Sequence, residues 1–194
     1  IIDTDKHLKD YRFDRYAQTL YEFFWHEFCD WHLEIAKVDT PTASRGAKMA
    51  QLYQVFNDIL VILHPALPFI TESLWEHSHP QSQCLAKTPS PKAEDFAQHQ
   101  EDLAMYEALK VLIGGIRNIR SELNIPPKAA LDLYVTKDNH QLFDTFQHEI
   151  QKLAGIKTIH QSDTPPKQCC AYVNPDVEIG IDLTGHIDPT QEIQ

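Results

Sequence analysis

The fold is decided by one stretch, Ile116-Arg117-Asn118-Ile119-Arg120-Ser121-Glu122-Leu123-Asn124-Ile125-Pro126-Pro127. Side chains on an α-helix turn by about 100° per residue, so apolar residues spaced by three and four share one face. Such spacing links Leu112, Ile116, Ile119 and Leu123. The two prolines end the helix, because proline has no N–H to donate and disfavours helical geometry in the residue before it. The pattern predicts a helix over about residues 93–124 with one buried face.

The opposite face of this helix is basic. It carries Lys110, Arg117 and Asn124, spaced by sevens, with Arg120 beside them. The whole chain has 17 Lys and Arg against 28 Asp and Glu, a net charge of −11. A few cations on a helix are usually a solvated face, and an acidic chain gains little from counterion release. The local reversal of charge still favours an anionic partner, because a confined patch can bind RNA when single-stranded bases add stacking and edge contacts.

The composition fits a globular protein of the cytoplasm. With 194 residues, 42% of them hydrophobic, the chain can form one domain or two small ones. No apolar run has the length of a membrane span, and the N-terminus lacks the pattern of a secretory signal. None of the four cysteines belongs to a Cys-x-x-Cys pair, so neither a disulfide framework nor a zinc ribbon is expected. We therefore expect a cytoplasmic protein without a membrane partner.

The sequence ahead of the basic helix is also predicted to be helical. A continuous apolar stripe at helical spacing consists of Phe13, Ala17, Leu20, Phe24, Phe28, Trp31, Ile35 and Val38. A second helix is expected over 43–63, where Pro65 ends it, and a shorter one follows Pro68. Five side chains are predicted to be buried, namely Phe24, Phe28, Leu74, Ile116 and Ile119.

After residue 127 the periodicity changes to two. Apolar residues alternate with polar ones over 131–135 and 177–183, as in strands with one buried face. Two further strands fit 156–159 and 169–173. An amphipathic helix between the strands is expected to start at Asp138 or Asn139 and to stop at Gly155.

The predicted fold is therefore mainly α with a small α+β module. The helical bundle is expected over 1–127, and a small sheet packed with one helix over 128–187.

Motifs for catalysis and metal binding are incomplete. His26-Glu27-Phe28-Cys29-Asp30 begins like the helix motif of zinc proteases, but Asp30 stands where the second histidine belongs. His77, His79 and Cys84 could supply three ligands from one loop, although 11 histidines in one chain make such proximity easy by chance. We expect no metal, no cofactor and no chemistry in this chain itself.

Three segments occur in a recognisable order: YEFFWHEFCDWHLEIAK at 21–37, LHPALPFITESLW at 63–75, and residues 116–127. They resemble the anticodon-binding domain of valyl-tRNA synthetases. The second segment also resembles, more loosely, the related isoleucine, leucine and methionine enzymes. Because all three lie at plausible separations, the resemblance covers most of the chain.

The resemblance implies a C-terminal piece of a class I enzyme that attaches valine to tRNA. Such enzymes use ATP with Mg in a catalytic domain that has His-Ile-Gly-His-like and Lys-Met-Ser-Lys-Ser-like motifs, and neither motif occurs here. The piece alone should be inactive. Its implied partner is the anticodon stem-loop of tRNA(Val), and the parent enzyme is expected to be a monomer. Residues 188–194 would begin a linker to a coiled-coil arm.

In that role, exposed polar groups are expected to contact the tRNA. The expected contacts are Trp31, Lys37, Lys110, Arg117, Asn118, Arg120 and Asn124. Arginines bind phosphates or stack on bases, and an asparagine amide offers a donor and an acceptor to a base edge. Trp31 could belong to the core or could expose its ring for stacking.

Two alternatives remain at this point. One is the anticodon-binding domain of a related isoleucine, leucine or methionine synthetase. The other is a non-enzymatic helical module whose acidic surface meets a basic protein.

Overall fold

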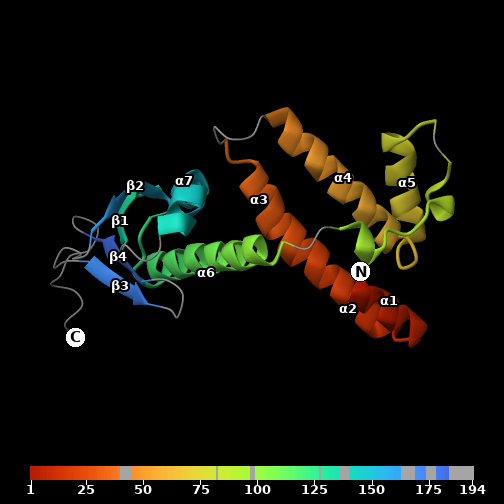
Figure 1. The fold of residues 1–194 in the computed structure, drawn as a ribbon, viewed down its shortest axis with the longest axis horizontal. Helices are drawn as coiled ribbons and strands as arrows, with labels where there is room; N and C mark the ends of the chain where they lie inside the picture. The colour runs from red at the N-terminus through yellow and green to blue at the C-terminus, as the bar shows by residue number, and fades with distance from the viewer. Residues whose placement is uncertain are drawn as a thin grey trace. The chain divides into compact units, whose positions relative to one another are not determined.

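A computed structural model describes residues 1–39, 45–81, 83–96, 99–126, 128–135, 140–162, 169–173 and 178–183. The chain forms two compact units, Ile1–Gln98 and His99–Gln194 (Figure 1). This division falls ahead of the basic helix, whereas the sequence pattern grouped that helix with the helical bundle. The helix belongs to the second unit because it packs against a helix of the α+β module. The linker expected at 188–194 lies outside the described residues.

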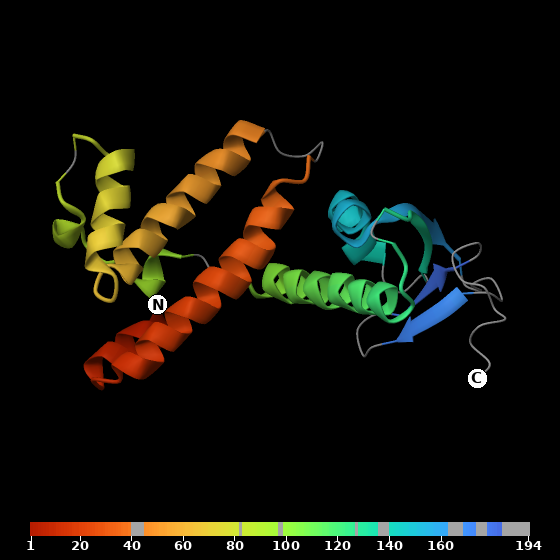
Figure 2. The same ribbon diagram turned by 180° about the vertical axis from the view of Figure 1, so that it is seen from behind.

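The described part of the first unit is helical. Its α-helices are α1 (Ile2–Lys9), α2 (Phe13–Tyr21), α3 (Leu33–Ala36), α4 (Arg45–Leu63) and α5 (Pro68–Ser78). A π-helix, η1 (Glu22–His32), joins α2 to α3, and two short 3₁₀ turns, η2 (Leu85–Lys87) and η3 (Ala93–Asp95), follow α5. The chain turns back after α3, so that α4 runs alongside the helix formed by α2, η1 and α3 (Figure 2).

The core of this hairpin contains Phe28, Leu52 and Ile59, with further apolar side chains packed around them. The predicted stripe is confirmed at Leu20, Phe28 and Val38 but wrong at Phe13 and Ala17, which are exposed. Tyr16 is buried in their place, and its hydroxyl donates a hydrogen bond to the Ile62 carbonyl. The π-helix explains the shift, because its turns are wider than those of an α-helix and displace the register of the face.

The expected burial of individual side chains is only partly correct. Phe28 and Ile116 are buried, whereas Phe24 and Ile119 are half-buried. The prediction for Leu74 is wrong, since this side chain is 41% exposed. Thr71, which is 1% exposed, is the only buried residue among those described in α5.

Polar contacts hold the turn between α4 and α5. The Thr71 hydroxyl donates to the Leu67 carbonyl at 2.8 Å, and its oxygen lies 2.8 Å from Nδ1 of His64. Glu72 accepts the backbone N–H of Leu85 at 2.8 Å, which ties α5 to η2. These contacts are internal, so this segment serves the architecture.

The second unit combines two helices with a sheet. Its elements are α6 (Gln100–Glu122), β1 (Leu131–Val135), α7 (His140–Ala154), β2 (Ile156–Gln161), β3 (Cys169–Val173) and β4 (Glu178–Asp182). The strand order is β2-β1-β4-β3. β1 and β2 are parallel, as expected for strands joined by a helix, and the other pairs are antiparallel. The predicted fold class, mainly α with a small α+β module, is confirmed.

The core of the second unit lies between α6, α7 and the sheet. Buried side chains come from all three: Leu109, Leu112, Ile113, Ile116, Leu131, Leu133, Leu142, Phe143, Ile150, Ile179 and Ile181. The alternation predicted for β1 is confirmed. Gly155 ends α7 as predicted, with a φ of +68°, whereas Asp138, Asn139 and Val177 lie outside the described residues. α6 begins at Gln100, seven residues later than the predicted start at 93.

None of the described helices is both long and apolar enough to cross a membrane.

Candidate nucleic-acid interface

The basic helix ends in a backbone motif built on Asn124. Its φ is +52°, in the left-handed region that asparagine tolerates better than most residues. The Asn124 N–H bonds the Ser121 carbonyl at 3.2 Å, and the Ile125 N–H bonds the Arg120 carbonyl at 2.8 Å. This pair of bonds is a Schellman motif, which satisfies the last carbonyls of α6 before the chain reaches Pro126. Asn124 is exposed, so its backbone serves the fold while its amide faces solvent.

Arg120 is not on the exposed face, contrary to the sequence prediction. It is 7% exposed, and its guanidinium donates to the carbonyls of Pro126 at 2.8 Å, Ala129 at 2.6 Å and Gly155 at 3.3 Å. Burial lowers the pKa of Arg120, although a guanidinium stays charged in proteins. The side chain thus fastens the end of α6 to the segment before β1 and to the start of β2. Its hydrogen bonds give Arg120 a structural role that the sequence pattern did not predict.

Arg117 and Asn118 are exposed, as predicted. The Arg117 Nε donates to the Leu153 carbonyl at 3.1 Å, which brings its side chain against the end of α7. A pocket of about 400 Å³ opens there. We call it the α6–α7 pocket; its lining is Arg117, Arg120, Ser121, Ile125, Lys152, Leu153, Ala154 and Gly155. Lys152 was missed in the sequence because it lies on another helix, far from the basic stretch.

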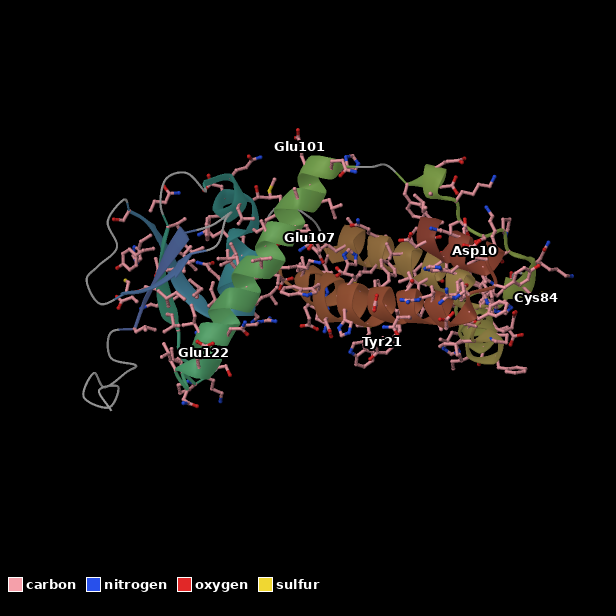
Figure 3. All side chains as sticks on the ribbon, turned by 90° about the horizontal axis from the view of Figure 1, so that it is seen from below. Asp10, Tyr21, Cys84, Glu101, Glu107 and Glu122 are labelled. Atoms are coloured by element: carbon pink, nitrogen blue, oxygen red, sulfur yellow. The ribbon has the colours of Figure 1, made fainter. Side chains whose placement is uncertain are left out.

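Lys110 is largely covered. Its side chain is 11% exposed, forms an ion pair of 2.9 Å with Glu107, and lies 5.4 Å from the centre of the Tyr106 ring. Glu107 projects from the same helix (Figure 3). The sequence prediction of a basic face from Lys110 to Asn124 is therefore wrong at this end, because a neighbouring carboxylate and a ring engage the ammonium.

Lys37 borders a second basic pocket, in the first unit. This α3–α4 pocket has a volume of about 350 Å³ and is lined by Leu33, Ala36, Lys37, Asp39, Arg45, Lys48, Met49 and Leu52. Lys37 forms an exposed ion pair with Glu34, and Lys48 donates to the Val38 carbonyl at 2.6 Å. The pocket combines an aliphatic floor with three cationic side chains and one carboxylate. Arg45 and Lys48 were missed because they come from the next helix.

Exposed aromatic rings lie elsewhere than expected. Trp31 is half-buried, which favours the core interpretation. Trp25 is 50% exposed and stacks on Tyr21, itself 56% exposed, with ring centres 6.4 Å apart and planes 2° from parallel. Tyr21 projects from the outer side of its helix (Figure 3). Their spacing of four residues off the predicted stripe was the signal that could have identified them.

The candidate metal ligands do not assemble in the described residues. His79 stacks on Trp75 at 4.0 Å, and its ring nitrogens lie near two hydroxyls, those of Tyr53 at 3.3 Å and Ser78 at 3.2 Å. His26 contacts Asp30 at 3.2 Å on an exposed face. Across the described ranges, no three His, Cys, Asp or Glu side chains come together in a way that could hold a metal ion.

Comparison with known proteins identifies the family. A family model described as the anticodon-binding domain of tRNA ligase matches residues 1–135. The chain belongs to this family of anticodon-binding domains. The match includes the α3–α4 pocket and all of α6, and it ends with β1, so α7 and the remaining strands lie beyond it.

Relatives of this anticodon-binding domain are long enzymes. A valine–tRNA ligase of Petrotoga mobilis is 31% identical over 100% of the chain, and one of Dechloromonas aromatica is 33% identical over 98%. A valine–tRNA ligase of Xylella fastidiosa is 35% identical over 94%. The chain spans only 20% to 23% of the length of these relatives. The α7 segment is therefore shared with them even though it lies outside the family model.

Proposed function

We propose that the chain is the anticodon-binding portion of a valine–tRNA ligase and that its partner is the anticodon stem-loop of tRNA(Val). The observation that carries this proposal is the similarity to valine–tRNA ligases along 94% to 100% of the chain, together with the family match over residues 1–135. The acidic protein-interaction module explains neither finding.

The parent enzyme attaches valine to tRNA with ATP and Mg in a catalytic domain outside this chain. It works as a monomer in the cytoplasm. The described residues hold tRNA and carry out no chemistry of their own. This division of labour agrees with a site made of cations, amides and aromatic rings, which are groups that bind RNA.

The α3–α4 pocket is the principal contact in the first unit. Its cations suit backbone phosphates, and the apolar lining residues Leu33 and Met49 suit the ribose or base of an unstacked nucleotide. Arg45 is exposed, and it has no hydrogen-bond or ion-pair partner among the described residues. The charge of Arg45 can therefore act on a phosphate. Asn118 and the Trp25–Tyr21 pair supply further exposed polar and stacking surface.

Replacing Lys37 and Arg45 together with alanine should weaken binding of the tRNA(Val) stem-loop by about 5- to 20-fold, because each lost phosphate contact costs up to about 1 kcal/mol at an exposed site. The slope of log affinity against log salt should fall by about 1.4, at about 0.7 per contact on a single strand. Fluorescence anisotropy with a labelled stem-loop measures both quantities.

The matched control is Lys6→Ala with Lys9→Ala. Both lysines are exposed on α1, and the pair removes the same charge. Its affinity should stay within about twofold of the unmodified chain. An equal loss in the two double variants would mean that only the total charge matters and that the pocket has no special role.

A further inference from the structure

We propose that the α6–α7 pocket binds a backbone phosphate of the tRNA, as a second contact that lies partly outside the matched anticodon-binding domain. The inference rests on the proposed function, since it names where the second unit would meet the same RNA. Its key residues are Arg117 on α6 and Lys152 on α7, with Arg120 and Ser121 forming the wall between them.

The first observation is the charge of the lining. Arg117, Arg120 and Lys152 converge on one pocket from two helices, and none of its described lining residues is acidic. The rest of the chain is strongly acidic, with a net charge of −11. Positive charge concentrated in one pocket attracts an anion to that place, and the acidic surroundings repel the anion.

The second observation is that the arginines are held in place. Arg117 is anchored through Nε on the Leu153 carbonyl, and Arg120 is anchored on three carbonyls. These hydrogen bonds to carbonyls fix the positions of the two guanidinium groups. A methyl group on Gly155 would come within 3.2 Å of the Arg120 Nη1, which shows how closely the chain encloses this guanidinium. A site fixed before binding loses less side-chain entropy when the ligand arrives.

The third observation concerns Lys152. The arginines alone can be explained by the exposed carbonyls at the ends of α6 and α7, because cations stabilise helix C-termini. The same explanation covers Lys152 in the last turn of α7, but it does not require the three cations to line one pocket. Lys152 is exposed in the last turn of α7 and has no hydrogen-bond or ion-pair partner among the described residues. Ser121 adds a hydroxyl that can donate to a phosphate oxygen.

A volume of about 400 Å³ accommodates a phosphodiester with part of its ribose. An acidic peptide is the competing ligand, but the proposed partner of this chain is an RNA, whose backbone presents a regular row of phosphates. A guanidinium such as that of Arg117 also matches two phosphate oxygens better than an ammonium group does.

The test is the affinity of the chain for full-length tRNA(Val) as a function of salt, with Arg117→Ala and Lys152→Ala combined. We expect binding to weaken by about 3- to 10-fold and the salt slope to fall by about 1. The control is Lys128→Ala with Lys157→Ala, two exposed lysines of the same unit outside the pocket. The control should change affinity by less than about twofold. Lys152→Arg, which keeps the charge, should bind as the unmodified chain does.

Equal losses in the two double variants, or no loss in either, would overturn the pocket assignment. If the arginine change disturbs folding, Lys152→Ala alone provides the comparison, because its side chain is exposed. If the unmodified chain binds tRNA, and the Lys37 and Arg45 variant binds more weakly but the Arg117 and Lys152 variant does not, only this inference fails. A chain that binds no tRNA overturns both proposals. If a poly-glutamate peptide displaces the tRNA when the two are present at equal concentrations of negative charge, an acidic protein is the favoured ligand instead.

Discussion

Replacing Arg120 with alanine should lower the free energy of unfolding of the second unit by about 3–5 kcal/mol, because its buried guanidinium donates several hydrogen bonds. The change removes three hydrogen bonds from a charged donor, each worth about 1.5–3 kcal/mol when counted alone. It also leaves the carbonyls of Pro126, Ala129 and Gly155 without this donor. The three bonds share one side chain, so their energies do not add in full. Native-state hydrogen exchange at the amides of β1 and α6 measures the loss.

Two variants make this prediction specific. Arg120→Lys keeps the charge, but a single ammonium cannot reach three carbonyls in the fixed fork of a guanidinium, so an intermediate loss is expected. Arg117→Ala should cost less than about 1 kcal/mol, because that side chain is exposed on the surface of α6. If Arg120→Ala lowers the free energy of unfolding as little as Arg117→Ala does, the structural role of Arg120 is contradicted. Such a result would indicate an exposed Arg120 side chain.

Truncating Phe28 to alanine should cost about 3–5 kcal/mol in the first unit, because a buried aromatic ring leaves a cavity that its surroundings fill only in part. Phe28 is 5% exposed, packs with Leu52 and Ile59, and stacks on Phe24 with ring centres 6.0 Å apart. The three tryptophans of the chain all lie in this unit, so urea denaturation followed by tryptophan fluorescence reports on it directly.

Phe69→Ala is the matched control, since the ring of Phe69 is 90% exposed on α5 of the same unit. Its loss should be within about 0.5 kcal/mol. Similar midpoints for the two variants would show that the π-helical register around Phe28 is incorrect.

The periodicity of the sequence predicted where helices and strands form better than it predicted which face of each helix is buried. On α6 the buried face is rotated away from Ile119 and Leu123 towards Leu109, Ile113 and Arg120. Arg120 lies four residues after Ile116, so its position was compatible with the buried face, but a charged residue was assigned to solvent. Its acceptors come from residues 126, 129 and 155, and the sequence gives no sign that those carbonyls converge.

The π-helix was unpredictable for a related reason. The segment Glu22–His32 has apolar residues at spacings that an α-helix also accommodates. The sequence therefore predicted one continuous α-helix through this segment. The wider turns moved Tyr16 inward and Phe13 outward. Tertiary contacts such as the bond from Tyr16 to Ile62 select this register, and they depend on a partner 46 residues away.

The basic sites show the same limit. Lys37 and Arg117 could be selected from their own helices, and both border basic pockets. Their partners Arg45, Lys48 and Lys152 come from the following helices. Such convergence depends on how two helices pack, which single-helix patterns do not contain.

The most direct test of the account compares two stem-loops: that of tRNA(Val) and the same stem-loop with its anticodon replaced. If this chain reads the anticodon, the replacement should weaken binding by about tenfold or more, because one lost base-edge contact costs about 1–3 kcal/mol. The salt slopes should stay equal, since the phosphates are unchanged. Equal affinity for the two stem-loops at every salt concentration would contradict the claim and leave only non-specific attraction between a basic surface and RNA.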